Sequence, residues 1–317
     1  MAAVAPGAQT EAGRAGGAVA ARRPLPRPRR RFKPSRAARY VILAVLAILF
    51  VAPFAYMVTS SFQPLSRIFA YPPQWIPTHP TLDNYKGFFT SDHPIGRWIL
   101  NSTFTTVTIT VVQLFLCSLV AYTFAKRTFP GRDFLFFLGL ATMMLPIQVV
   151  MIPNYLILKG VPLFGGNDLF GVGGHGWLDS YWGYIVPNVM NPFGIFLLRQ
   201  YMKSIPDELL DAARIDGAGH FRIYWRVVLP LSRPALAALG IFTFQFWWQA
   251  FFWPLIIINS PSLYTLPLGL ALFQEHNRVV WNLIMAGSVL GALPLVIVFL
   301  IFQRQFVRGI SLSGMKG

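Results

Sequence analysis

The stretch DAARIDGAGHFRIYWRVVLP, from Asp211 to Pro230, is a polar segment containing glycines that lies between two long uncharged runs, 180–198 and 234–274. A helix needs about 20 mostly apolar residues to cross a bilayer, and each run can supply such a helix. A connection between two spans needs only a few residues, so a loop of this length calls for an explanation. The flanking runs predict a membrane protein, and the loop predicts a functional element within it.

Outward from this loop, the uncharged runs are 40–66, 98–125, 134–158, 180–198, 234–274 and 279–303. The run 234–274 is interrupted at Asn259–Ser262, which leaves one span there. We therefore predict an all-α polytopic protein with one six-helix transmembrane domain, 40–308, and spans at about 40–61, 98–125, 134–158, 181–199, 235–258 and 280–303. Only 12% of the residues are charged, against about 25% in a soluble domain, which agrees with this class.

The distribution of basic residues predicts the orientation. With the N-terminus inside, 22 of the 27 Lys and Arg residues lie in inner segments and five lie in outer loops, as the positive-inside rule requires. Residues 1–39 are rich in Ala, Gly, Pro and Arg and predict a disordered basic cytoplasmic tail. Residues 309–317 form the predicted cytoplasmic C-terminal tail. Because the charge follows the loops and forms no basic face on a folded module, we expect no nucleic-acid partner.

The loop 204–230 is predicted to form a pair of short helices. Ser204 can cap the first helix, and Asp207 and Glu208 suit the positive end of its dipole. Gly217 and Gly219 end this helix and allow a sharp reversal. A second helix runs from about His220 to Leu229 and ends at Pro230. Its expected apolar face consists of Phe221, Tyr224, Trp225 and Val228.

An amphipathic helix pair at the membrane face presents apolar side chains that lipid does not cover. Such a pair either packs under its own bundle or fits a groove on a partner protein. The residue pattern alone leaves both arrangements open.

The same stretch resembles the coupling-loop signature of bacterial ABC importer permeases. That signature is Glu-Ala-Ala, three residues, Gly, nine residues, Ile, one residue and Leu-Pro. Here its positions are held by Asp211, Ala212, Ala213, Gly217, Leu229 and Pro230, and the two departures are Asp211 for Glu and Val227 for Ile. Both departures keep the charge or the branching of the side chain.

The resemblance extends to the carbohydrate branch, in particular the smaller membrane subunit of maltose-type systems. It is carried by Leu145-Pro146, by Pro153-Asn154-Tyr155 and by the C-terminal Gly314-Met315-Lys316-Gly317. It implies a type I ABC importer fold in a bacterial cell membrane, with both termini in the cytoplasm.

The implied partners are a dimer of ATPase subunits, a second permease that makes a heterodimer, an extracytoplasmic solute-binding protein and membrane lipid. ATP and Mg are used by the ATPase subunits, and no cofactor is expected in this chain. The segment 206–220 would sit in a cleft of one ATPase subunit, and Lys316 and Gly317 would reach the ATPase dimer. The expected coupling residues are Asp207, Glu208, Asp211, Ala212, Ala213, Asp216, Gly217, Gly219, Leu229 and Pro230.

Polar and aromatic residues in the fourth and fifth predicted spans are candidates for the transport pathway. They are Asn188, Asn191, Gln245, Trp248 and Gln249. Amides and aromatic faces together suit a sugar. The alternative is helix–helix packing with amide cross-links.

Other function classes fit the sequence less well. The chain has no Gly-x-x-x-x-Gly-Lys-Ser/Thr loop, so we predict no ATP site of its own and no enzymatic activity. A stand-alone secondary transporter would need ionisable groups within the spans, and the sequence places none there. A membrane-embedded enzyme would need converging carboxylates and nucleophiles, which are also missing. The strongest rival is the same machine with a non-sugar solute.

Overall fold

The computed structural model describes residues 36–275 and 278–313 of the chain. These residues are helices and loops apart from one antiparallel pair of two-residue strands, β1 (Gln274–Glu275) and β2 (Arg278–Val279). The predicted all-α class is therefore confirmed. Most of the predicted N-terminal tail, and the last four residues, lie outside the described residues. The chain divides into two compact units, Met1–Phe50 and Val51–Gly317; α1 has residues in both, and the candidate site lies in the second.

Three unbroken helices are long and apolar enough to cross a membrane: α1 (Arg36–Ser61, apolar from Ala38), α4 (Ile95–Lys126) and α15 (Trp281–Ser313). They cover the predicted spans 40–61, 98–125 and 280–303. The α15 helix continues to Ser313, so helical structure extends into the predicted C-terminal tail.

The third predicted span is bent. It consists of α5 (Arg132–Ala141), the short 3-10 helix η1 (Thr142–Met144) and α6 (Ile147–Lys159), which meet at an angle of 104°. The break falls at Pro146, whose backbone is extended and which cannot donate a helical hydrogen bond. The fifth predicted span is α12 (Arg233–Trp248) followed, after a break at 249–251, by α13 (Phe252–Ile257).

The fourth predicted span, 181–199, does not form one helix. It is divided into α7 (Tyr181–Ile185), the short η2 (Val186–Asn188) and α8 (Pro192–Lys203). The break falls at Asn191, whose side chain caps α8, and at Pro192, which begins it. By length and composition, the described residues supply three membrane-spanning helices, or up to five if each of two bent pairs is one span. The two pairs are α5–η1 with α6, and the helix His220–Leu231 with α12.

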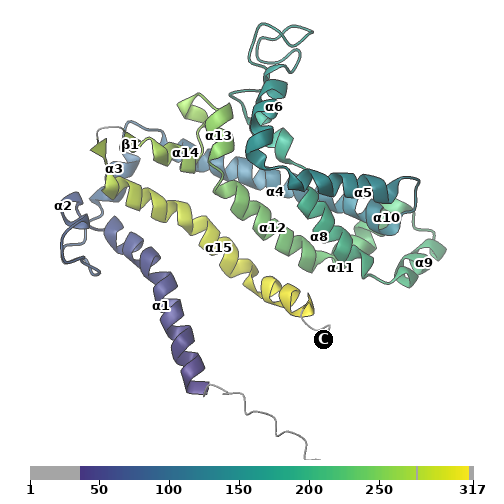
Figure 1. Ribbon diagram of the computed structural model, residues 1–317, viewed down its shortest axis with the longest axis horizontal. Helices are drawn as coiled ribbons and strands as arrows, with labels where there is room; N and C mark the ends of the chain where they lie inside the picture. The colour runs from purple at the N-terminus through teal and green to yellow at the C-terminus, as the bar shows by residue number, and fades with distance from the viewer. Residues whose placement is uncertain (1–35, 276–277, 314–317) are drawn as a thin grey trace, which may run out of the picture. The chain divides into compact units, whose positions relative to one another are not determined.

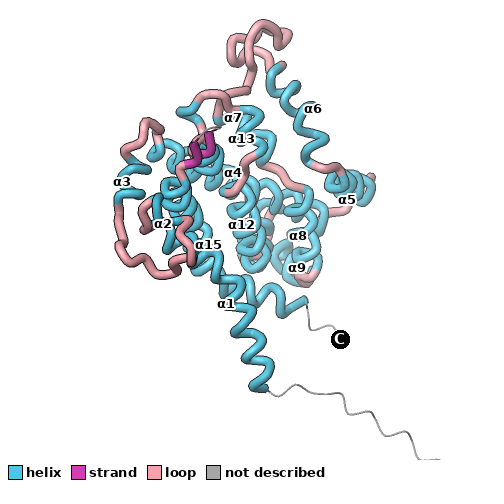
Figure 2. Tube along the Cα trace, turned by 60° about the vertical axis from the view of Figure 1, so that its left-hand side comes forward, coloured by secondary structure: helices cyan, strands magenta, loops and turns pink. Residues whose placement is uncertain are grey.

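The α4 helix is the centre of the bundle. It packs along α8 and α12, and α12 packs in turn along α15 (Figures 1 and 2). Small side chains permit the close approach of α4 and α8: Gly194 of α8 faces Cys117 of α4 and Leu239 of α12. This packing fixes which elements lie at each end of α4.

The two ends of α4 carry different structures (Figure 1). At its N-terminal end lie α3 (Asp83–Phe89), η4 (Pro261–Leu263) and α14 (Leu266–Ala271), while α2 (Leu65–Ile68) packs beside α15. At its C-terminal end lie α9 (Asp207–Ile215), α10 (His220–Ile223), the π-helical turn η3 (Tyr224–Val228) and α11 (Leu229–Leu231). The segment 204–230 therefore forms a structure of its own beside the end of α4.

Candidate functional site

The predicted helix pair is present, and its first helix is α9. The helix begins at Asp207 after Pro206, and no side chain caps it. Ser204 does not cap α9 as predicted, because its hydroxyl donates to the Tyr201 carbonyl (2.7 Å) and Ser204 ends α8 instead. The acidic Asp207 and Glu208 lie in the first turn of α9, where they favour the helix dipole.

A buried lysine holds the start of α9 against the end of α4. The Lys126 ammonium lies 2.8 Å from the Asp207 carboxylate and 2.5 Å from the Ile205 carbonyl oxygen. Its side chain is only 4% exposed, so the ion pair is screened by solvent on one side only. These two contacts fasten the start of α9 to the end of α4.

The α9 helix has one covered and one uncovered apolar side. Leu210 is buried in a cluster with Ile223 and Tyr224, which fastens α9 under its own bundle. Ile215, in contrast, is 88% exposed, and Leu209 is 46% exposed. The sequence left two arrangements open, packing under the bundle and fitting a partner protein. One side of α9 packs under the bundle, and the other side is exposed.

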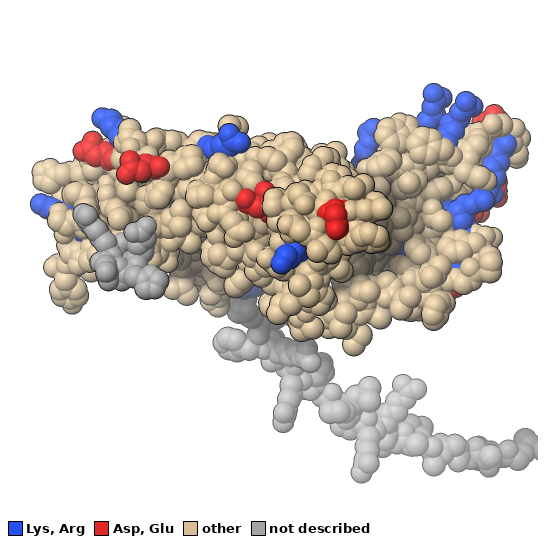
Figure 3. Space-filling view, turned by 90° about the horizontal axis from the view of Figure 1, so that it is seen from above, with Lys and Arg blue, Asp and Glu red and all other residues tan. Residues whose placement is uncertain are grey.

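The residues of the coupling-loop signature lie together on this element. Asp211 accepts a hydrogen bond from Arg214 (2.6 Å), and Gly217 ends α9 with a positive φ of 76°. Gly219 does not end α9 as predicted; it starts α10 with an ordinary φ of −68°. The expected coupling residues that are exposed here are Asp207, Glu208, Asp211, Ala212, Asp216, Gly217 and Gly219. Charged side chains gather at this end of the molecule (Figure 3).

The second helix is continuous from His220 to Leu231 but includes a π-helical turn. Its predicted apolar face is divided: Tyr224 and Val228 are buried, whereas Phe221 and Trp225 are exposed and stack on each other. Only part of the apolar surface is covered, because α4 contacts one edge of it. The helix ends one residue later than Pro230, and the chain then bends by 77° into α12.

Two contacts join this second helix to α4. The hydroxyl groups of Ser118 and Tyr224 lie 2.8 Å apart, and the Arg127 guanidinium lies 3.0 Å from His220 Nδ1. Together with Lys126, these contacts connect both helices of the pair to one transmembrane helix.

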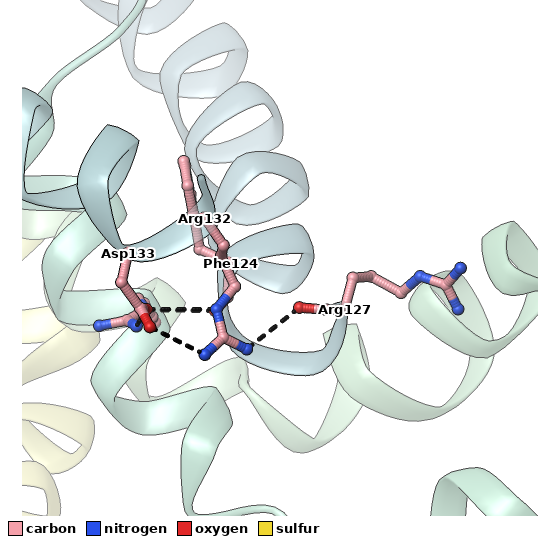
Figure 4. A network of polar contacts seen from close by, with 5 residues as sticks. Phe124, Arg127, Arg132 and Asp133 are labelled. Atoms are coloured by element: carbon pink, nitrogen blue, oxygen red, sulfur yellow. Dashed lines mark hydrogen bonds and ion pairs between the residues drawn. The ribbon is translucent and has the colours of Figure 1, made fainter. Parts of the chain in front are cut away.

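The sequence did not predict the role of one further cation, Arg199, which was counted among the basic residues of the inner segments. The side chain of Arg199, in α8, is 6% exposed and makes an ion pair with Asp133 of α5 (3.0 Å). Its Nε donates to the Phe124 carbonyl of α4 (3.2 Å), and the guanidinium lies 3.8 Å from the centre of the Phe136 ring. Asp133 also binds Arg132 (Figure 4). No sequence signal joins groups so far apart in the chain.

A cavity of about 740 Å³ lies beside α12 at its break. Its wall is mainly aromatic, and it includes two of the predicted pathway residues, Gln245 and Gln249. Trp248 is buried instead, and its indole donates to the Gly291 carbonyl (2.7 Å). Asn188 donates to the Tyr184 carbonyl (2.7 Å), and Asn191 caps α8. These last three predicted residues thus contact protein in this structure.

The described residues give no indication of a metal-binding or redox-active site. They contain no group of three or more His, Cys, Asp and Glu side chains that could hold a metal ion. The single cysteine, Cys117, is buried among apolar side chains at the contact of α4 and α8. The predicted ATPase contacts Lys316 and Gly317 lie outside the described residues.

Known proteins similar to this chain are transport permeases. The family model described as "Binding-protein-dependent transport system inner membrane component" matches residues 113–312. The arabinooligosaccharides transport system permease protein AraQ of Halalkalibacterium halodurans is 33% identical, with 86% of this chain and 94% of that protein covered. The sn-glycerol-3-phosphate transport system permease protein UgpE of Yersinia pestis is 35% identical, with 85% and 93% covered.

A solved structure shares the fold. One chain of a bacterial ABC transporter involved in the import of the acidic polysaccharide alginate matches with a TM-score of 0.71 at 23% identity. The match covers 84% of this chain and 95% of that chain. The helical arrangement described above is therefore that of an importer permease.

Proposed function

Because the chain belongs to the family of binding-protein-dependent transport system inner membrane components, we propose that it forms half of the transmembrane pathway of an ABC importer for a neutral sugar or oligosaccharide. It is a multi-pass membrane protein. A second permease subunit completes the pathway as a heterodimer, a solute-binding protein delivers the substrate from outside, and separate ATPase subunits use ATP and Mg inside. The N- and C-termini are cytoplasmic, consistent with the distribution of Lys and Arg.

The observation that carries the coupling role is the two-sided α9 helix. Lys126 and Leu210 fasten one side to the bundle, while Ile215 and the acidic side chains around Asp211 remain uncovered. This surface is suited to a cleft on an ATPase subunit. Closure of the ATPase dimer would move α9, and the contacts of Lys126 would pass that movement to α4 and reorient the pathway.

A neutral sugar is favoured by the cavity beside α12. The amides of Gln245 and Gln249 can hydrogen-bond hydroxyl groups, and the aromatic wall can stack against a sugar ring. Among the described residues, no Lys or Arg lines this cavity, whereas a phosphate ester or an acidic saccharide would favour a cationic partner. An anionic solute, as named for the glycerol-3-phosphate permease, is therefore the second candidate.

The coupling role is tested by reconstituting the complete importer in proteoliposomes. We expect Asp211→Lys and Gly217→Leu to insert and assemble, yet to lose uptake driven by ATP hydrolysis, because both alter the uncovered side of α9. Gly96→Ala, near the opposite end of α4, serves as control, since a Cβ there meets nothing within 4 Å. Wild-type rates of substrate-stimulated hydrolysis and uptake in the first two variants would exclude this role.

The substrate class is tested separately, through the solute-binding protein captured with the intact complex. We expect it to bind neutral oligosaccharides in a calorimetric titration, and sn-glycerol 3-phosphate at least tenfold more weakly. Tighter binding of the phosphate ester would favour the second candidate and leave the coupling role unaffected.

A further inference from the structure

A second surface cavity, of about 390 Å³, lies between the last turns of α4, the segment after it and the start of α10. One part of its wall is polar and contains Arg127, Tyr122, Thr123 and Thr128. Another part is apolar and contains Leu119 and Phe221. None of the described residues that line the cavity is a carboxylate, so the cavity combines a positive polar region with apolar side chains.

The Arg127 guanidinium is available to a ligand in this cavity. Figure 4 shows its side chain directed away from Asp133, which is bound by Arg132. Its Nη1 lies 3.0 Å from His220 Nδ1, and because a guanidinium offers only donors, Arg127 is the donor in this contact. Arg127 makes no ion pair with any carboxylate of the described residues. Its positive charge is thus not neutralised by the protein around it.

The neighbouring helix carries a surface of the kind found at membrane interfaces. On the helix from His220 to Leu231, the exposed residues Phe221, Arg222, Trp225 and Arg226 lie side by side. The rings of Phe221 and Trp225 stack with their centroids 6.2 Å apart. Exposed aromatic rings beside arginines are typical of the boundary between lipid headgroups and acyl chains.

The contacts with α4 place this surface at the depth of a membrane boundary. Tyr224 is held at the level of Ser118, and His220 at the level of Arg127, so the helix lies beside the last turns of a candidate membrane span. The uncovered acidic side chains of this loop belong to α9, whereas Phe221 and Arg222 are on the other helix. The aromatic and basic surface therefore complements an anionic lipid better than a protein cleft.

We propose that this cavity binds the headgroup of an anionic phospholipid. The phosphate lies against Arg127 and the Thr128 hydroxyl, Arg222 adds a second positive charge, and an acyl chain lies along Leu119 and Phe221. The binding itself does not depend on the proposed transport function. If the N-terminus is cytoplasmic, as proposed, the bound lipid belongs to the cytoplasmic leaflet. This assignment alone rests on the proposed orientation.

The test is native mass spectrometry of the complete importer, released from nanodiscs that contain equal amounts of phosphatidylglycerol and phosphatidylcholine. We expect the wild type to retain phosphatidylglycerol in preference to phosphatidylcholine. Arg127→Gln and Arg222→Gln should each weaken this retention about fivefold, as expected for one basic residue near an anionic headgroup. Arg127→Lys keeps the charge and should restore most of it.

Arg67→Gln, a change in α2 at the other end of the bundle, is the matched control and should bind phosphatidylglycerol as the wild type does. Equal retention of the two lipids by the wild type would overturn the proposal, and so would undiminished retention by Arg127→Gln. If Arg127→Gln instead released the ATPase subunits while lipid retention stayed unchanged, the cavity would belong to a protein interface, and the lipid proposal would again be wrong.

Discussion

At the scale of single residues, the end of the bundle at the C-terminus of α4 is organised by cations that the protein buries. Arg199 joins α8 to α5 and α4, and Lys126 joins α4 to α9. Desolvation of a cation is costly unless its hydrogen bonds are satisfied, and each of these two has a carboxylate and a backbone carbonyl as partners. Neither partnership follows from local sequence, because the pairs are 66 and 81 residues apart.

Asp133, the counter-ion of Arg199, should contribute more to the free energy of unfolding than Arg132, the other basic residue that binds it. We expect Asp133→Asn to lower the free energy of unfolding more than Arg132→Gln does, because the buried Arg199 guanidinium loses its counter-ion. Arg132→Gln removes only a partly exposed cation and should cost about 0.5 kcal/mol. Denaturant unfolding of the two purified variants measures both values. Equal effects would show that the buried ion pair contributes nothing of its own.

Asp179 makes the contact between the loops 160–180 and 258–260 sensitive to acid. It accepts hydrogen bonds from the backbone N–H groups of Asn259 and Ser260 and from the Ser260 hydroxyl. Burial alone would raise the pKa of Asp179, but the hydrogen bonds from Ser260 and Asn259 outweigh it, so the pKa lies below its ordinary value. The folded protein thus favours the ionised carboxylate, and this stabilisation is present above the ordinary pKa of about 3.9.

The stabilisation should be lost as the pH falls through the lowered pKa of the folded state. We therefore expect the thermal midpoint of the wild type to fall below pH 4 more steeply than that of Asp179→Asn, which has no carboxylate to protonate. At pH 7 the variant should be less stable by about 2 kcal/mol. Parallel pH profiles for the two proteins would remove the role assigned to this carboxylate.

At the scale of elements, the helix pair α9–α10 is the part of the site that the sequence predicts best. Its acidic first turn and glycine hinge lie where the pattern places them. The details that fail are those decided by neighbours: the Ser204 hydroxyl finds a carbonyl of α8, and α4 covers only part of the second apolar face. Whether a residue caps a helix or is buried depends on which groups lie near it in the fold. A single segment of sequence does not reveal those neighbours.

The two glycines of the hinge should differ in their tolerance of a side chain. Gly217 has a φ of 76°, so Gly217→Ala forces an L-residue into a left-handed conformation and should destabilise α9 by about 1 kcal/mol. Gly219 has an ordinary φ and open space around it, so Gly219→Ala should be neutral within about 0.5 kcal/mol. Hydrogen exchange of the α9 amides compares the two. Faster exchange in Gly219→Ala than in Gly217→Ala would contradict the assigned hinge.

At the scale of the whole molecule, composition and charge predicted the class of the protein, and tertiary packing decided the rest. Long apolar runs became the continuous helices α1, α4 and α15, and two of these helices contain an internal proline, Pro53 in α1 and Pro294 in α15. The other runs are broken at Pro146, at Asn191 and at Gln249, where caps, prolines and a cavity meet. The sequence identifies each apolar run by its length and lack of charge. The direction of the two halves of a broken run, however, depends on contacts with α4.

The central claim is that the uncovered side of α9 faces the cytoplasm and is covered there by an ATPase subunit. Ile215 is 88% exposed and is the natural position for a probe. In a Cys117→Ser background, Ile215→Cys is treated with a membrane-impermeant maleimide in intact cells, in inverted vesicles, and in inverted vesicles stripped of ATPase. Leu169→Cys, in the exposed loop 160–180, reports the opposite side of the membrane.

We predict that Ile215→Cys reacts only in the stripped inverted vesicles and is protected again when ATPase subunits are added back, while Leu169→Cys reacts in intact cells. Labelling of Ile215→Cys in intact cells, or equal labelling with and without the ATPase subunits, would contradict the account.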